Sequence, residues 1–205
     1  MGQMAQRFES VLETYRETRP LLRHFASLAP VTTIMDVGCG DGFISRYMAR
    51  DLGAREMTLV DLVPRVTPGV LETATFRKID VCDQAFLSLK GRGQVVTCFL
   101  AFHEFLEPER AAKHLIQVLP PRGMLCLVDR SEGGWKEEAA MAREEGGDAL
   151  AHYENDLRLL GRTGLGTSAG ITQFWWNMRK NMARMGGRWE ISQTNRNYTV
   201  SYQAP

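Results

Sequence analysis

Clustered cysteines are missing from this chain of 205 residues. Its four cysteines, Cys39, Cys82, Cys98 and Cys126, lie far apart, form no C-x-x-C pair and do not group with the four histidines at metal-ligand spacing. This pattern argues against a disulfide framework and against a zinc-type centre. We expect four reduced, mostly buried thiols and no bound metal.

A dominant charge and a long apolar run are missing as well. The 25 Lys and Arg residues offset 24 Asp and Glu residues, which leaves a formal charge of +1 and makes nucleic acid a less favoured partner than a small molecule. No stretch reaches about 18 apolar residues, and the charges in residues 1–20 are atypical of a signal peptide. The sequence thus predicts a cytoplasmic protein without a membrane span, either a monomer or a homodimer.

Internal repeats and low-complexity segments are also absent, so the organisation comes from apolar runs that alternate with amphipathic stretches. The expected strands cover residues 32–37, 56–61, 75–79, 94–102 and 123–129, and the expected helices between them include 44–52 and 107–119. Strands separated by helices imply right-handed crossovers and therefore a doubly wound, mostly parallel α/β sheet. Two alternating runs at 188–194 and 198–203 predict a closing β-hairpin.

We expect one domain over residues 1–205. Its parts are an N-terminal helical cap (1–30), a cofactor-binding core (31–129), a helical lid or crossover (130–187) and the C-terminal hairpin (188–205). The spacing of apolar residues in the cap predicts one or two amphipathic helices broken near Pro20, because proline interrupts a helix. The long, charged segment between the fifth and sixth strands exceeds what a simple crossover needs, which indicates a lid.

Three glycines occupy the first expected turn from strand to helix, within IMDVGCGDGF at 34–43. Ligands bind outside the carboxyl ends of parallel strands, and Gly38, Gly40 and Gly42 allow the backbone to approach a ligand or the helix to start close to the strand. The register differs from the dinucleotide fingerprint G-x-G-x-x-G, since Phe43 stands where its last glycine would be. No Gly-Lys-Ser/Thr follows either, which excludes a P-loop.

Acidic residues follow three of the expected strands. Asp36 precedes the glycine turn, Asp61 ends the second strand and Asp80 follows the third. These carboxylates favour a cationic ligand over a pyrophosphate, and Asp61 is suited to accept two hydrogen bonds from ribose hydroxyls. Together with the sequence DVGCGDG, their order and spacing over residues 31–129 resemble the class I S-adenosylmethionine-dependent methyltransferases, whose first motif has the form acid-x-Gly-x-Gly-x-Gly.

The resemblance implies a Rossmann-like methyltransferase fold with a seven-stranded, mostly parallel sheet, N-terminal helices and a helical lid insertion between strands five and six. The stretch FHEFLEPERAAKHLIQVLPPRGMLCLVDRS is further similar to the ubiquinone/menaquinone-biosynthesis group. By resemblance, S-adenosyl-L-methionine would bind to Asp36, Gly38, Gly40 and Gly42 with its methionine part, to Asp61 with its ribose, and to Leu62, Val81, Asp80 and the Leu100 carbonyl with its adenine. For Asp36, a buried cap on the following helix is the alternative interpretation.

His103, in AFHEF just past the fourth strand, is the candidate general base because histidine titrates near neutrality. Glu104 is the alternative base. A purely structural histidine that lines the pocket or bonds a backbone carbonyl stays open as well. The sequence AFHE differs from the Asn/Asp-Pro-Pro-aromatic motif of enzymes that methylate amide or exocyclic base nitrogens, which argues against such acceptors.

The acceptor must be recognised outside the core. The candidates for this role are Tyr15, Arg16, His152, Tyr153 and Trp175. The function predicted is methyl transfer in line to an O, N or C atom, most readily of a small molecule. An RNA or protein methyltransferase, a non-catalytic accessory subunit that binds S-adenosylmethionine, and a nicotinamide-dependent oxidoreductase are the alternatives.

Overall fold

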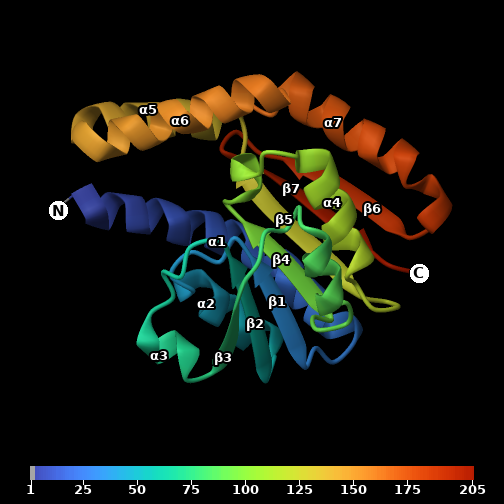
Figure 1. Cartoon of the computed structure of the whole chain (residues 1–205). Helices are drawn as coiled ribbons and strands as arrows, with labels where there is room; N and C mark the ends of the chain where they lie inside the picture. The colour runs from blue at the N-terminus through green and yellow to red at the C-terminus, as the bar shows by residue number, and fades with distance from the viewer. Residues whose placement is uncertain (1–2) are drawn as a thin grey trace.

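The computed structural model describes residues 3–205 as a seven-stranded sheet with helices on both faces (Figure 1). The strands are β1 (Thr33–Val37), β2 (Glu56–Asp61), β3 (Ala74–Lys78), β4 (Val95–Phe99), β5 (Met124–Arg130), β6 (Arg188–Gln193) and β7 (Asn197–Gln203). They lie in the order β3-β2-β1-β4-β5-β7-β6. All pairs from β3 to β5 are parallel, whereas β7 is antiparallel to both β5 and β6. The predicted doubly wound, mostly parallel sheet with a closing hairpin is confirmed.

Helices cover both faces of this sheet. They are α1 (Gln3–Leu28), α2 (Phe43–Leu52), α3 (Pro68–Leu71), α4 (Pro108–Gln117), α5 (Glu132–Glu145), α6 (Gly147–Thr163) and α7 (Ser168–Asn181), with short 3₁₀ turns η1 (Gln84–Leu89), η2 (Phe102–Glu104) and η3 (Ala183–Met185). Buried side chains of α1 and α2 pack on one face, and those of α4 to α7 pack on the other. Because the first strand-to-helix turn follows the end of β1, it lies at the carboxyl edge of the parallel strands, where ligands bind in such folds.

The central strand β4 shows why the apolar runs fold as they do. All five of its residues are buried. Val95 and Phe99 face the α1/α2 side, while Val96 and Cys98 face the α4 side, because successive side chains of a strand point to opposite faces. A strand covered on both sides has to be apolar along its whole length, which matches the sequence.

The expected break near Pro20 is wrong, because α1 runs through it as one helix of 26 residues. Proline removes one backbone hydrogen bond but not the packing on either side of it. Tyr15 before the proline and Leu22 and Phe25 after it all join the same hydrophobic cluster with α2 and the sheet. Burial of both halves on one face outweighs the local cost of the proline.

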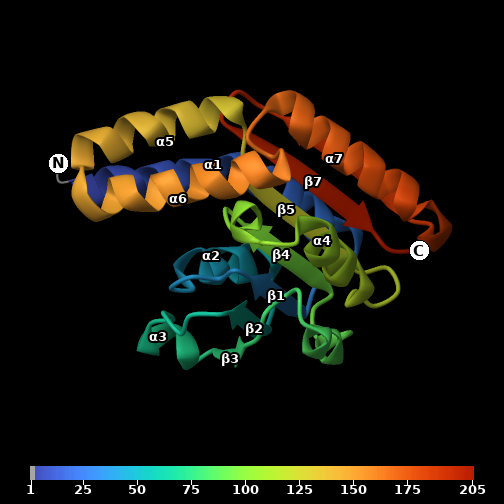
Figure 2. The same ribbon diagram turned by 45° about the horizontal axis from the view of Figure 1, so that its top comes forward.

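Residues 130–187 contain three helices, as the expected helical insertion requires. Figures 1 and 2 both show α5 and α6 side by side as a hairpin of helices, with α7 continuing along the β6–β7 hairpin. These helices pack against the core through buried side chains, which include Trp135, Leu160 and Trp175. Whether the segment moves as a lid stays a prediction.

The first turn of α5 packs directly on the backbone of the β6–β7 turn. A Cβ atom built on Gly134 would lie 2.0 Å from the carbonyl oxygen of Arg196, and one on Gly133 equally close to that of Asn195. We expect Gly134→Ala to lower the free energy of unfolding by about 1–3 kcal/mol, because backbone must move to admit the methyl group. Urea denaturation measures this change.

The control for that substitution is Gly161→Ala, in the last turn of α6. No atom lies within 4 Å of a Cβ built there. Alanine is the better helix former by about 1 kcal/mol, so this variant should be at least as stable as the parent chain. Equal destabilisation by both substitutions would contradict the argument from close packing.

All four cysteines are buried and free, as predicted. Within residues 3–205, no group of three or more histidine, cysteine or acidic side chains is placed to hold a metal ion. The same described part of the chain has no helix that is both long and apolar enough to cross a membrane.

Candidate active site

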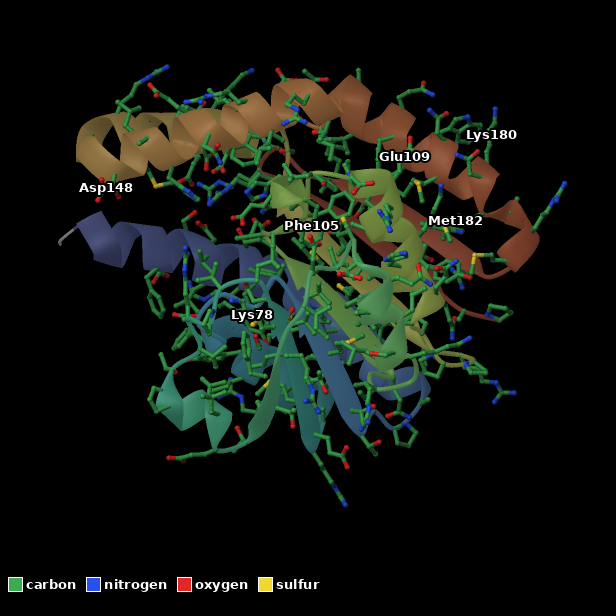
Figure 3. The ribbon with its side chains drawn as sticks, viewed as in Figure 1. Lys78, Phe105, Glu109, Asp148, Lys180 and Met182 are labelled. Carbon is green, nitrogen blue, oxygen red and sulfur yellow. The ribbon has the colours of Figure 1, made fainter. Side chains whose placement is uncertain are left out.

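A cavity of about 390 Å³ opens at the carboxyl ends of β1, β2 and β4. Its wall comes from the β1–α2 turn, from residues that follow β2 and β3, and from Val11 of α1. After β4 it is lined by Leu100, Ala101, Glu104 and Phe105. Phe105 marks this rim in Figure 3, near the middle of the molecule and below the inserted helices in that view. The glycine turn and the acids singled out in the sequence thus meet in one place.

The three glycines of the turn have different tasks. All have positive φ, at 72° for Gly38, 55° for Gly40 and 78° for Gly42. A Cβ on Gly38 would lie 2.3 Å from that of Ala101, and one on Gly42 would lie 2.9 Å from Val70. Nothing lies within 4 Å of a Cβ on Gly40. Gly40 therefore leaves open space for a ligand, whereas the other two allow close packing between turns.

Asp36 is both buried and part of the cavity wall. Ser45 of α2 donates its hydroxyl to one carboxylate oxygen at 2.5 Å, and Thr97 of β4 donates to the other at 2.6 Å. Burial raises the pKa of Asp36 to about 6, against the lowering effect of these two hydrogen bonds. The bond from Ser45 ties the end of β1 to α2. The alternative of Asp36 as a cap on this helix is wrong, because the N-cap of α2 is Gly42 and no side chain caps it.

Asp61 joins the end of β2 to the glycine turn. One carboxylate oxygen accepts the main-chain N–H of Gly40 at 2.9 Å, and the other accepts that of Val63 at 3.0 Å. A carboxylate oxygen has two lone-pair directions, so both oxygens retain acceptor capacity toward the cavity. The pair Asp61–Gly40 thereby fixes an acceptor beside open space.

The far wall of the cavity carries Asp80 and Val81. Asp80 accepts the main-chain N–H of Cys82 at 2.8 Å. The buried His114 of α4 donates from Nδ1 to the Val81 carbonyl at 2.7 Å and so anchors this loop to the core. Sequence reasoning missed His114, whose only signal was a histidine on the apolar face of a helix.

Leu100 and Leu62 complete the apolar part of the wall. Leu100 has φ of 53°, a left-handed conformation that costs a leucine about 1–2 kcal/mol. Its N–H donates to the carbonyl of Val128 at 2.8 Å, which holds the chain in this turn directly after β4. Strained backbone of this kind is typical of functional sites.

His103 lies behind the cavity wall and is buried. Its Nδ1 is 2.8 Å from Asp129 of β5, whose second oxygen accepts the His103 main-chain N–H at 2.7 Å. The ring meets Trp135 edge to face. This partner assigns the proton to Nδ1, and leaves Nε2 directed toward Glu104, 3.9 Å away.

The pKa of His103 reflects two opposing influences. Burial lowers it, but the charge and the hydrogen bond of Asp129, with smaller contributions from Glu104 and Asp156, raise it above its ordinary value. Glu104 itself lines the cavity, with its side chain about half exposed. Of the two candidate bases, Glu104 is thus the one whose side chain lines the cavity, and His103 lies next to it.

None of the five predicted acceptor-binding residues, all within the described chain, lines the cavity. Tyr15 is buried and donates its hydroxyl to Asp51, and the exposed Arg16 pairs with Glu9 at 2.6 Å. Val11 is the residue of α1 that reaches the cavity. Tyr15 and Arg16 thus lie outside this cavity wall, and their role in acceptor binding stays a prediction.

The remaining three candidates belong to the inserted helices. Trp175 is fully buried against Phe102 in the core and does not line the cavity. Tyr153 is also buried in the core. His152 is exposed, with Nε2 3.6 Å from Asp156. Only this last pair points toward the region of His103 and Glu104, since α6 packs against η2.

Comparisons with known proteins agree with this geometry. A family model described as a methyltransferase domain matches residues 6–162. The biotin biosynthesis bifunctional protein BioCD of Bordetella avium is 25% identical over 148 residues, which are 65% of this chain and 31% of that protein. A 2-methyl-6-phytyl-1,4-hydroquinone methyltransferase of Synechocystis is 32% identical over 109 residues, 50% of this chain and 33% of the relative. The matches thus span about a third of either relative.

Among solved structures, that of the plantazolicin methyltransferase BamL with a triazolic desmethylPZN analog and SAH has a similar fold. It superposes with a TM-score of 0.74 at 13% identity and covers 97% of this chain and 87% of its own. At this identity the likeness concerns the fold. It extends over the inserted helices and the closing hairpin as well as the sheet.

Proposed function

The chain belongs to the methyltransferase domain family, and from this premise we propose that it transfers the methyl group of S-adenosyl-L-methionine to a small-molecule acceptor. The observation that carries the proposal is the pair formed by Asp61 and Gly40, a carboxylate fixed at the rim of a cavity beside backbone with free space in front of it. The SAH in the BamL structure, which shares the fold, supports the same ligand class.

The residues present fit this cofactor. Gly40 offers the space that a side chain would fill, and Asp61 offers the acceptors that ribose hydroxyls need. Leu62 and Val81 supply apolar surface for the adenine, with Asp80 and the main chain of Leu100 beside them. Asp36, Gly38 and Gly42 hold the turn in shape from beneath.

When bound, S-adenosyl-L-methionine supplies a methyl group activated by its positively charged sulfur. The chain has to orient the acceptor, exclude water and remove a proton where the acceptor carries one. Glu104 faces the cavity and is proposed as the group that touches the acceptor. His103, held by Asp129, is proposed as the proton acceptor behind it.

The alternatives are weighed by the same observations. The family match and the glycine register argue against a nicotinamide-dependent oxidoreductase. A carboxylate in the cavity wall with a histidine directly behind it favours an enzyme over an accessory subunit. An RNA or protein acceptor has no specific support. Four free, buried cysteines suit the reducing cytoplasm, which we propose as the location.

A thermal denaturation experiment tests the proposed cofactor. Ligand at about 100 times its Kd stabilises the native state by about 2.7 kcal/mol, which for a chain of this size corresponds to a rise in Tm of about 5–10 °C. We expect this rise with S-adenosylmethionine and S-adenosylhomocysteine and no rise with NAD. A shift with NAD alone would overturn the proposal.

A further inference from the structure

Four ionisable side chains from three elements interact electrostatically with one another, and Glu104 is the member of this cluster that lines the cavity. Glu104 and His103 come from η2, Asp129 from β5 and Asp156 from α6. Asp156 is only 4% exposed, and its Oδ1 accepts no hydrogen bond from the described residues. Its other oxygen is 3.6 Å from Nε2 of His152. A buried carboxylate oxygen without a donor is costly, and at a binding site it points to a donor on the ligand.

Other charges around the cluster already have partners. Asp129 accepts hydrogen bonds from the ring and main chain of His103 and from the main chain of Arg130. The Arg130 side chain forms an ion pair with Glu138 at 2.7 Å. In this cluster, Asp156 and Glu104 are the two acids that keep carboxylate oxygens without a hydrogen-bond donor from the described residues.

The pKa values of these two acids point the same way. Burial raises the pKa of Asp156, although His103 and His152 oppose it. Desolvation raises that of Glu104, with Asp156 adding to the effect and His103 opposing it. Asp156 therefore disfavours the charge of Glu104, while Glu138 and Asp129 disfavour that of Asp156. A cation placed between Glu104 and Asp156 would stabilise the charged form of both.

The cavity wall has the same polarity. It contains five acidic residues, Asp36, Asp41, Asp61, Asp80 and Glu104, and the single base Arg65. The four aspartates accept hydrogen bonds from main-chain N–H groups or hydroxyls of the chain. Glu104 accepts none from the described residues. An anionic acceptor would be repelled from this wall, and a cationic one attracted.

We propose that Glu104 and Asp156 bind a protonated amine, so that the methyl acceptor is an amine nitrogen. This inference rests on the proposed function of the same cavity. The ammonium group donates to the two carboxylates, and one of its protons then passes through Glu104 to Nε2 of His103. The amine is left neutral with a free lone pair, and the histidine becomes a cation beside Asp129.

Sinefungin supplies the test, because it carries a protonated amine where S-adenosylmethionine carries its transferable methyl group and S-adenosylhomocysteine carries nothing. Calorimetric titration of the full chain with both ligands gives the ratio of their Kd values. We expect sinefungin to bind at least about tenfold more tightly than S-adenosylhomocysteine, which is about 1.4 kcal/mol. Equal affinities would overturn the inference.

Variants then assign the preference to the two acids. Glu104→Gln and Asp156→Asn should each lower the Kd ratio at least about threefold, with S-adenosylhomocysteine affinity retained as proof of folding. The control is Asp148→Asn, the same change on the exposed start of α6, which Figure 3 shows at the outer end of the helix pair. An unchanged ratio in both variants contradicts the amine site, whereas failure of the parent chain to bind S-adenosylhomocysteine contradicts the proposed function instead.

Discussion

Replacement of Glu104 by glutamine should lower the turnover number by about 10²- to 10⁴-fold, the usual contribution of a general base. Glutamine keeps the size of the side chain and its place in the cavity wall but cannot take up a proton. The affinity for S-adenosylhomocysteine should stay within about threefold, because the Glu104 side chain is not among the groups proposed to hold the cofactor. Steady-state kinetics with the identified acceptor and calorimetry provide the two measurements.

The control for this substitution is Glu109→Gln, on the exposed first turn of α4 (Figure 3). It removes the same charge from a nearby position outside the cavity wall. Its turnover should match that of the parent chain. A Glu104→Gln variant with parental turnover would remove this residue from the mechanism.

The pH dependence of turnover identifies the group behind Glu104. His103 accepts a proton only in its neutral form, so turnover should rise with pH through an inflection above the ordinary histidine pKa of about 6.5. The charges that face it are Asp129 from β5, Glu104 from η2 and Asp156 from α6. In Asp129→Asn the raising influence is lost and burial dominates, so the inflection should move to lower pH.

Asparagine in place of Asp61 should raise the Kd for S-adenosylhomocysteine about 100-fold, which is about 2.7 kcal/mol. Both carboxylate oxygens accept main-chain N–H groups, from Gly40 and Val63. In the variant the amide nitrogen must face one of these donors, which breaks a hydrogen bond and disturbs the glycine turn. The charge-assisted bonds proposed to the ribose are weakened at the same time.

Glu72→Gln is the matched control for Asp61→Asn. Glu72 is an exposed acid at the end of α3, outside the cavity wall. Its loss should leave the Kd unchanged, since exposed charges away from the site are screened by salt. Similar Kd values for the Asp61 variant and the parent chain would show that the cofactor does not contact this carboxylate.

Most of the fold could be predicted from the sequence because its signals are local. The apolar runs predict the bounds of the core strands to within three residues, and Gly53 marks the end of α2. The exception was Pro20, where a local signal for a break was overruled by packing on α2 and the sheet. That packing depends on contacts distant in sequence, which no window around the proline contains.

In the candidate site, too, local sequence signals could be recognised, whereas contacts between distant residues could not. The proposed cofactor residues could be found because each follows directly on a strand. The partners could not, since Asp129 lies 26 residues from His103, and His114 lies 33 from Val81. Nor does the sequence tell which face of a helix meets the cavity: Val11 lines it, whereas the predicted Tyr15, Arg16 and Trp175 do not.

The inserted helices separate the proposed acceptor-binding Asp156 from the residues proposed for the cofactor, which bears on the evolution of the fold. The residues proposed for the cofactor lie between Asp36 and Leu100, whereas Asp156 belongs to a single uninterrupted stretch between β5 and β6. Exchange of that one stretch by recombination would alter acceptor preference and leave the methyl-donor half intact. New acceptor specificities could therefore arise by replacement of this one segment, without a loss of cofactor binding.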